Sequence, residues 1–219
     1  HEDIPVWMSA GSEALLKASK IFLPDAKVPE VINLLTMWEP VEIGPFNVTP
    51  YLADHSSPDA VSLLIEANGK RVFYSGDLRA TGRKKVVFAK LIKNPPRDID
   101  CLLLEGTMMG RGKQNFSTEE SIEEEFVRLL HDQTNLAFIF CSGQNLDRLV
   151  SAFRACKKMH KTFVIDLYTA YVLDSLGLIS ESIPQYDWKE IRVKYWKSDA
   201  DKIAKGGDKK FLYKVNKQR

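Results

Sequence analysis

Apolar and polar residues alternate along several short stretches in the first half of the chain, a pattern typical of half-buried β-strands. Asn68 and Gly69 separate two of these stretches, and both residues tolerate the positive φ that a two-residue hairpin turn requires. Apolar residues at helical spacing predict a helix at residues 12–22. The strands predicted after it are residues 41–43, 46–52, 61–67 and 71–75, with a further buried strand at 100–104.

The apolar spacing changes after residue 116. The run Ser-Thr-Glu-Glu that begins at Ser117 fits a capping box and predicts a helix over residues 118–131 with Ile122, Phe126, Leu129 and Leu130 on one face. Strands and helices then alternate, which predicts β-α-β units and a parallel sheet. We therefore place a boundary in the loop 110–116 and predict two domains, residues 1–116 and 117–219. The elements predicted for the second domain are a strand at 135–141, a helix at 145–158, a strand at 162–166 and a helix from Tyr168.

Charge and composition add few constraints. The chain has 219 residues, 44% hydrophobic and 27% charged, as expected for a globular protein, and its net charge of +2 argues for no particular partner. Residues 190–219 are nevertheless basic, with 10 Lys or Arg against 4 Asp or Glu, and aromatic residues are interleaved among them. Such a segment could contact nucleic acid, but ordinary packing with solvated charge is the interpretation we favour.

The chain contains no apolar run near the roughly 20 residues that a membrane-spanning helix needs, and its start lacks a leader pattern. We therefore expect a cytoplasmic protein without a membrane partner. Its three cysteines, Cys101, Cys141 and Cys156, have no metal-binding spacing and are predicted to be reduced, buried thiols. Whether the chain forms a homodimer is left open.

Two residues that suit metal chemistry follow predicted strands. His55 comes just after one strand and Asp77 just after another, so both could reach one rim of the fold. A histidine nitrogen binds zinc or manganese, and an aspartate can bridge two divalent ions about 3.5 to 4 Å apart. By spacing alone, a structural role for both residues is favoured.

The sequence motifs around these residues resemble those of a known family. The run from residue 4 to 178 resembles metallo-β-lactamase-fold hydrolases of the β-CASP and ribonuclease J-like type, through HSSPDA, SGDLR and LLLEGT in that order. The resemblance implies an α/β chain, with part of a metallo-β-lactamase αββα sandwich followed by part of a β-CASP domain. It also implies two divalent metal ions, zinc or manganese, with His55 as a ligand and Asp77 as a bridge. Glu105 would lie at the edge of the active site and orient a ligand or the substrate.

Other motifs of that family are missing from these 219 residues. The H-x-H-x-D-H signature should precede Ile4, and no histidine follows His160. A remnant of the signature at His1 and Asp3 is disfavoured, because Ile4 occupies the place of its last histidine. Two ligands cannot hold a catalytic metal tightly, so we expect the chain alone to bind metal poorly and to be inactive.

A second candidate is the turn at Ser142, Gly143, Gln144 and Asn145, which precedes a predicted helix. Free backbone N–H groups and the helix dipole could bind a substrate phosphate there, or Ser142 or Asn145 could simply cap the helix; both alternatives stay open. Arg79, with Arg83, Lys84 and Lys85, could likewise meet substrate phosphates or be solvated surface charge.

The resemblance favours a ribonuclease, because the insertion domain supplies a wall for a polymer, with RNA, or else DNA, as substrate. One alternative is a metallo-hydrolase of small esters, thioesters or lactones, since a fold does not fix a function. The other is a non-catalytic RNA-binding module.

Overall fold

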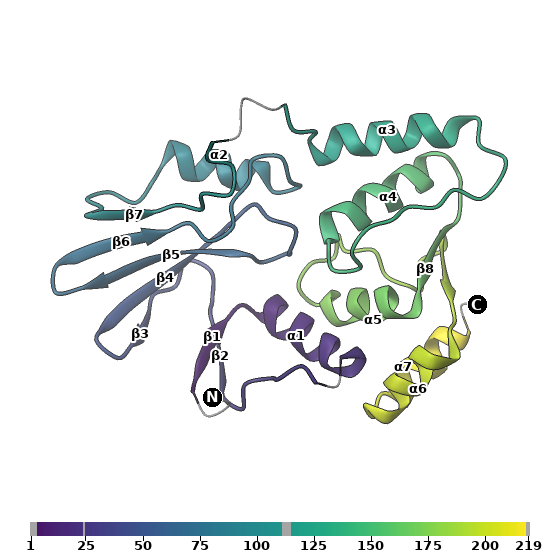
Figure 1. The fold of residues 1–219 in the computed structure, drawn as a ribbon, viewed down its shortest axis with the longest axis horizontal. Coiled ribbons are helices and arrows are strands. Elements are labelled where there is room, and N and C mark those ends of the chain that lie inside the picture. Colours follow the sequence, from purple (N-terminus) through teal and green to yellow (C-terminus); the bar gives the residue numbers. More distant parts are fainter. Residues whose placement is uncertain (1–3, 24, 111–114, 218–219) are drawn as a thin grey trace.

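The computed structural model describes residues 4–23, 25–110 and 115–217 (Figure 1). Its strands are β1 (Val6–Met8), β2 (Ile32–Leu34), β3 (Val41–Ile43), β4 (Phe46–Leu52), β5 (Val61–Ala67), β6 (Lys70–Tyr74), β7 (Cys101–Leu103), β8 (Phe163–Asp166) and β9 (Ile191–Lys194). Its helices are α1 (Ala10–Phe22), α2 (Lys85–Lys93), α3 (Glu119–His131), α4 (Leu146–Lys158), α5 (Leu167–Leu176), α6 (Lys197–Lys205) and α7 (Lys209–Asn216). None of the helices within those ranges combines the length and apolar character that crossing a lipid bilayer requires.

The first half is organised around a five-stranded sheet with the order β3-β4-β5-β6-β7. The first four strands pair antiparallel, and the β5–β6 hairpin turns at Asn68, whose φ is 51°, as the sequence predicts. β7 then pairs parallel to β6. Because β4 and β6 are both antiparallel to β5, the carboxyl ends of β4, β6 and β7 meet at one edge of the sheet.

β7 differs from its prediction. The sequence predicts a buried strand with a buried thiol, but Cys101, Leu102 and Leu103 are all exposed. The apolar run does form a strand. Its exposure follows from its position, because β7 is the last strand of the sheet order and β6 is its only neighbour among the described strands. Of the other cysteines, Cys156 is buried as predicted and Cys141 is half-buried.

The second half is built on β8 and β9, which pair in parallel with helices α4 and α5 beside them. A parallel pair is therefore present in this half, as the sequence predicts, but it joins β8 to β9, and the strand predicted at residues 135–141 is wrong. This segment is irregular, and its largest apolar side chains, Leu136, Phe138 and Phe140, are 80% or more exposed. Alternating apolar residues favour a strand only where a partner strand is in register, and the strand that pairs with β8 is β9.

α3 begins one residue later than predicted. Thr118, not Ser117, is the N-cap, and its hydroxyl accepts a hydrogen bond from the amide of Ser121. The predicted apolar face is also only partly correct, because Leu129 is 56% exposed. The buried residues of this helix include Glu119 and Glu123, whose carboxylates pair with basic side chains of α4.

The main core of the molecule lies in the second half, but α1 contributes to it. α1 packs against α5 and α6, and Phe22 contacts Tyr168 edge to face, with ring centroids 4.8 Å apart. The predicted domain boundary at residue 116 stays a prediction, with its loop residues 111–114 outside the described ranges. Any division there must leave α1 attached to the second half.

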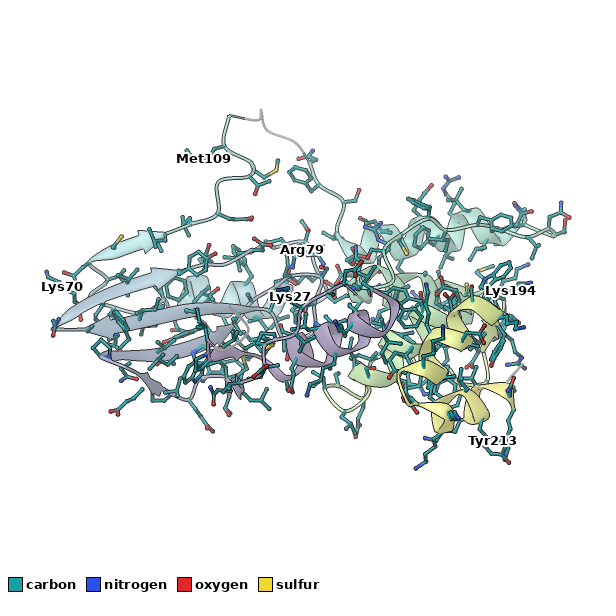
Figure 2. The ribbon with its side chains drawn as sticks, turned by 60° about the horizontal axis from the view of Figure 1, so that its bottom comes forward. Lys27, Lys70, Arg79, Met109, Lys194 and Tyr213 are labelled. Atoms are coloured by element: carbon teal, nitrogen blue, oxygen red, sulfur yellow. The ribbon has the colours of Figure 1, made fainter. Side chains whose placement is uncertain are left out.

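The basic C-terminal segment folds into β9, α6 and α7. Phe211 of this segment is buried in the core, and its ring centroid lies 5.3 Å from that of the buried Tyr186, as the packing interpretation expects. Tyr213 instead points outward at the far end of the molecule (Figure 2), where Lys217 lies 4.6 Å from its ring. The segment therefore combines ordinary packing with a solvated, basic outer face.

Candidate functional site

The predicted site residues gather at the edge where three strands end. His55 follows β4, Asp77 follows β6 and Glu105 follows β7. The Nε2 atom of His55 lies 3.9 Å from Oδ2 of Asp77, and the two side chains are 36% and 75% exposed. The structure thus brings together two groups that are 22 positions apart in the sequence, in a place that solvent reaches.

Gly76 explains how the chain turns into Asp77. Its φ is +58°, and a Cβ atom at this position would lie 2.7 Å from the carbonyl oxygen of Val61. A side chain would therefore suffer both backbone strain and a clash with the start of β5. The glycine of the SGDLR motif thus has a steric role: it allows the turn that places Asp77 at this edge.

Glu105 is connected to the same edge through its backbone. Its amide donates a 3.1 Å hydrogen bond to the hydroxyl of Ser75, and the carbonyl of Ser75 accepts a 2.6 Å bond from the hydroxyl of Ser62. Its own side chain is exposed and accepts a hydrogen bond from Thr107. Glu105 is therefore placed at the rim by β6 and β7, and its role in the site stays a prediction.

The His55 and Asp77 side chains fit a metal ion in part. An imidazole nitrogen and a carboxylate oxygen are suitable donors, although their 3.9 Å separation exceeds the roughly 3.3 Å between two tetrahedral ligands that each lie about 2 Å from one ion. However, no group of three or more His, Cys, Asp or Glu residues within the described ranges could hold an ion, and the His1 to Asp3 alternative lies outside those ranges. By donor type, the described residues thus supply two of the four ligands of a tetrahedral shell.

The loop of residues 54–59, hereafter the His55 loop, is anchored on both sides of the histidine. Asp59 accepts a 2.6 Å hydrogen bond from the amide of Gly11, in the first turn of α1. Asp54 is fully buried and accepts hydrogen bonds from the amides of Gly82 and Lys84, at 2.9 and 3.0 Å. Burial raises the pKa of Asp54 above its ordinary value, although these two bonds and the charge of Lys84 act to lower it.

Lys84 is a functional candidate that the sequence did not reveal. Solvated surface charge is wrong for Lys84 and Arg83, whose side chains are 17% and 12% exposed, while a phosphate contact by either residue stays a prediction. The Nζ atom of Lys84 donates to the carbonyl oxygens of His55 and Ser57, at 2.7 and 2.9 Å. Burial lowers the pKa of Lys84, although the nearby carboxylates of Asp147 and Asp54 raise it.

Arg79 also points into the protein. Its guanidinium forms an ion pair with the carboxylate of Asp147 on α4, and Figure 2 shows it where the sheet meets the helices of the second half. The pair leaves only a quarter of the Arg79 side chain exposed. A contact between Arg79 and substrate stays a prediction. In the structure, its ion pair joins the loop after β6 to α4.

The turn at residues 142–145 lies beside the His55 loop, because the amide of Leu146 donates a 3.2 Å hydrogen bond to the carbonyl of Ser56. Asn145 caps α4 by accepting a hydrogen bond from the amide of Arg148. The amide of Gln144 bonds to the hydroxyl of Ser142, and that of Asn145 to the Ser142 carbonyl. The capping alternative is therefore confirmed for Asn145, while phosphate binding by the turn stays a prediction.

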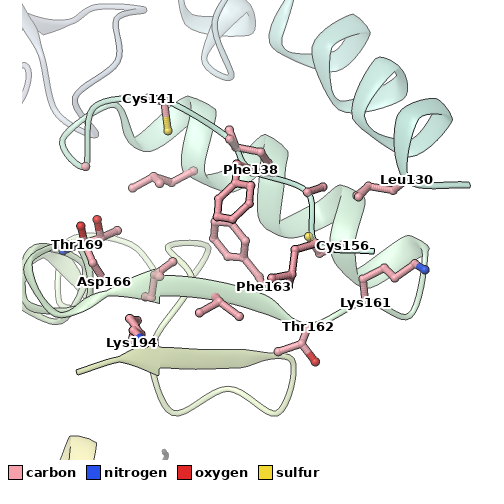
Figure 3. Close-up of a pocket in the computed structure, with 18 of the residues that line it drawn as sticks. Leu130, Phe138, Cys141, Cys156, Lys161, Thr162, Phe163, Asp166, Thr169 and Lys194 are labelled. Atoms are coloured by element: carbon pink, nitrogen blue, oxygen red, sulfur yellow. Dashed lines mark hydrogen bonds between the residues drawn. The ribbon is translucent and has the colours of Figure 1, made fainter. Parts of the chain in front are cut away.

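A cavity of about 780 Å³ lies elsewhere, between residues 135–141 and β8. Figure 3 shows Phe138 and Cys141 facing Phe163 and Asp166 across it. Its lining includes Gly143 from the candidate turn but neither His55 nor Asp77. The cavity is therefore separate from the metal-ligand pair.

Comparison with known proteins identifies the family of the first half. The family model described as the beta-lactamase superfamily domain matches residues 1–134, well over half of the chain. The chain belongs to the beta-lactamase superfamily. This family has a metallo-hydrolase-like fold, and its members are commonly hydrolases that bind divalent metals such as zinc. Membership therefore agrees with the sheet, with the strand-end site and with the nature of its two donors.

Solved structures support the fold of nearly the whole chain. One similar structure is the crystal structure of a protein of unknown function from Enterococcus faecalis V583, with a TM-score of 0.69 over 90% of this chain. The sequences are 19% identical, so the likeness concerns the fold alone. The chain of the present protein spans about half the length of that chain, because the match covers 47% of it. No curated protein matches the chain significantly.

Proposed function

We propose that the chain belongs to a metal-dependent hydrolase that cleaves phosphodiester bonds in RNA, with His55 and Asp77 as two of its metal ligands. The observation that supports this most directly is the 3.9 Å approach of the two side chains at the strand-end edge of a beta-lactamase superfamily domain. Two zinc or manganese ions, when bound, would convert a water molecule into a hydroxide nucleophile at neutral pH. His55 would contribute a neutral nitrogen, and Asp77 would offer both carboxylate oxygens as a bridge.

The placement of the second half supports a long substrate. The amino end of α4 contacts the His55 loop directly, so a second α/β unit adjoins the candidate site. A small ester or lactone does not need such a neighbour, whereas a polymer needs a surface along which its backbone extends. The motifs HSSPDA and SGDLR, which resemble those of β-CASP and ribonuclease J-like enzymes, favour RNA among polymers.

The proposal is tested in the natural protein with the variant Asp77→Ala. RNA cleavage should fall by roughly 100-fold or more, because a bridging ligand is lost, while RNA binding stays largely intact. The matched control is Asp100→Ala, which removes an exposed carboxylate that pairs with Lys70 outside the strand-end edge. Cleavage by Asp77→Ala at the rate of the control would refute the metal-ligand role.

Substrate assays separate the remaining alternatives. Metal-dependent turnover of a lactone or thioester, without RNA cleavage, would replace the RNA assignment with a small-molecule hydrolase. Salt-dependent RNA binding without metal-dependent turnover would instead identify a non-catalytic RNA-binding module. Comparing an RNA with a DNA of the same sequence distinguishes the two nucleic acids.

A further inference from the structure

We propose that Lys84 and Asp147 are positioning residues that hold the backbone of the His55 loop and make its geometry depend on α4. The proposal rests on the function proposed above, in which His55 is a metal ligand. It adds two residues that touch neither a metal ion nor a substrate but determine where the imidazole lies.

Three consecutive carbonyl groups of the loop are held from outside it. The Nζ atom of Lys84 binds the carbonyl oxygens of His55 and Ser57, and the amide of Leu146 binds that of Ser56 between them. Because each peptide unit is planar, fixing a carbonyl oxygen also restricts the orientation of the Cα atoms on either side. The direction in which the His55 side chain leaves the backbone is thus set by Lys84 and by the start of α4.

Asp147 balances the charge that this arrangement buries. Its carboxylate is 7% exposed and lies 3.8 Å from Nζ of Lys84, while it also pairs with Arg79 and accepts a 3.1 Å bond from the amide of Arg83. A buried ammonium without a counter-ion is strongly unfavourable, so Lys84 depends on Asp147 to remain in place. Asp147 lies in the first turn of α4, where the helix dipole favours a negative charge.

The contacting groups come from three separate segments of the chain, so they link the position of α4 to that of the His55 loop. Lys84 comes from the loop after Asp77, the held carbonyls come from the loop that carries His55, and Asp147 and Leu146 come from α4. A displacement of α4 would therefore reach both candidate ligands through one set of contacts. A contact between substrate and the second half would in this way adjust the metal-ligand geometry.

The test compares Lys84→Met and Asp147→Asn with Arg148→Met. Arg148 is also on α4, and its guanidinium pairs with the buried Glu119 and not, among the described residues, with the His55 loop, which makes it a matched control. Hydrogen–deuterium exchange is measured on the 219-residue chain at the amides of Arg79, Gly82 and Leu146, which donate hydrogen bonds to Asp54 and Ser56 of the His55 loop, with unfolding by urea measured in parallel. We expect exchange at these amides to be at least 10-fold faster in the two test variants and unchanged in the control, relative to exchange elsewhere in the sheet.

Equal exchange of the Arg79, Gly82 and Leu146 amides in Lys84→Met and Arg148→Met would overturn the proposal. If Lys84→Met does not fold, Lys84→Gln, which keeps a donor but no charge, gives the same comparison. In the natural protein, Lys84→Met should weaken metal binding roughly 10- to 100-fold, as is usual when a group that orients a ligand is lost. Because exchange needs neither metal nor RNA, its outcome is independent of the Asp77→Ala assay, which alone decides the proposed function.

Discussion

The guanidinium of Arg79 donates a hydrogen bond to the carboxylate of Asp147, although 68 positions separate the two residues. Arg79 is two residues from the candidate ligand Asp77, and Asp147 is on the first turn of α4. This ion pair joins the strand-end edge of the sheet to the second α/β unit. The basic side chains and buried carboxylates around it form a polar junction between the two halves.

Gly82 lies where this junction is tightest. A Cβ atom there would be 2.2 Å from Oδ1 of Asp54 and 2.8 Å from Oδ2 of Asp147. We expect Gly82→Ala to lower the free energy of unfolding by about 1 to 3 kcal/mol, because buried, hydrogen-bonded carboxylates would have to move. Urea denaturation measures this loss. Gly106→Ala is the control, since its nearest neighbour would be the sulfur of Met109 at 3.5 Å, and an equal loss in both variants would contradict the crowding.

Substitutions of Asn145, the N-cap of α4, distinguish a capping role of this residue from a role in substrate binding. Asn145→Ala removes the acceptor for the Arg148 amide and should cost about 1 kcal/mol of stability. Asn145→Asp keeps an acceptor and should retain that stability, as thermal unfolding would show. If the turn also binds RNA phosphate, Asn145→Asp should weaken RNA binding by charge repulsion. Unchanged RNA affinity in a stable Asn145→Asp protein would leave the turn with its capping role only.

Two buried tyrosines predict a loss of stability at high pH. Burial, with a contribution from Asp208, raises the pKa of Tyr171 to about 12, and burial beside Asp174 does the same for Tyr186. Between pH 10 and 12 the unfolded chain loses these phenolic protons while the folded chain keeps them, so stability is full below pH 10 and falls as pH rises. The loss should reach roughly 2 to 3 kcal/mol per tyrosine. Absorbance titration of Tyr171→Phe and Tyr186→Phe checks it: each variant should lack one late-ionising group.

Metal content tests the number of ligands. With only His55 and Asp77 as described donors, the 219-residue chain should retain less than one equivalent of zinc or manganese after dialysis. Elemental analysis of the dialysed chain measures this directly, and His55→Ala should remove whatever weak binding a titration detects. Two ions retained per chain after dialysis would show that ligands beyond this pair are present.

Local patterns predicted much of the fold and the central pair of the site. The β5–β6 hairpin could be predicted because Asn68 and Gly69 favour one turn geometry whatever surrounds them. His55 and Asp77 could be predicted as candidates because they follow predicted strands and lie in HSSPDA and SGDLR, the motifs on which the family resemblance rests. The exposure of Cys101 and the irregular structure of residues 135–141 could not be predicted. Burial and strand pairing depend on neighbours that a local sequence pattern does not contain.

Lys84 and Asp147 were missed for a related reason. A lysine beside Arg83 and Lys85, and an aspartate in the first turn of a helix, both look like surface residues in the sequence. The positioning role proposed for them depends on the contact between α4 and the loop after Asp77, which joins residues more than 60 positions apart. The one local sign was Gly82, a glycine between basic residues that leaves room for two buried carboxylates.

The exposed position of β7 has a practical consequence for every measurement on the isolated chain. Leu102 and Leu103 are 56% and 49% exposed on a strand that pairs only with β6 among the described strands. The unpaired side of such a strand presents amide and carbonyl groups to solvent, next to apolar side chains, and readily templates addition of another strand. Purified chains should therefore associate edge to edge as their concentration rises, and a dilution series by light scattering belongs before any of the stability or metal experiments.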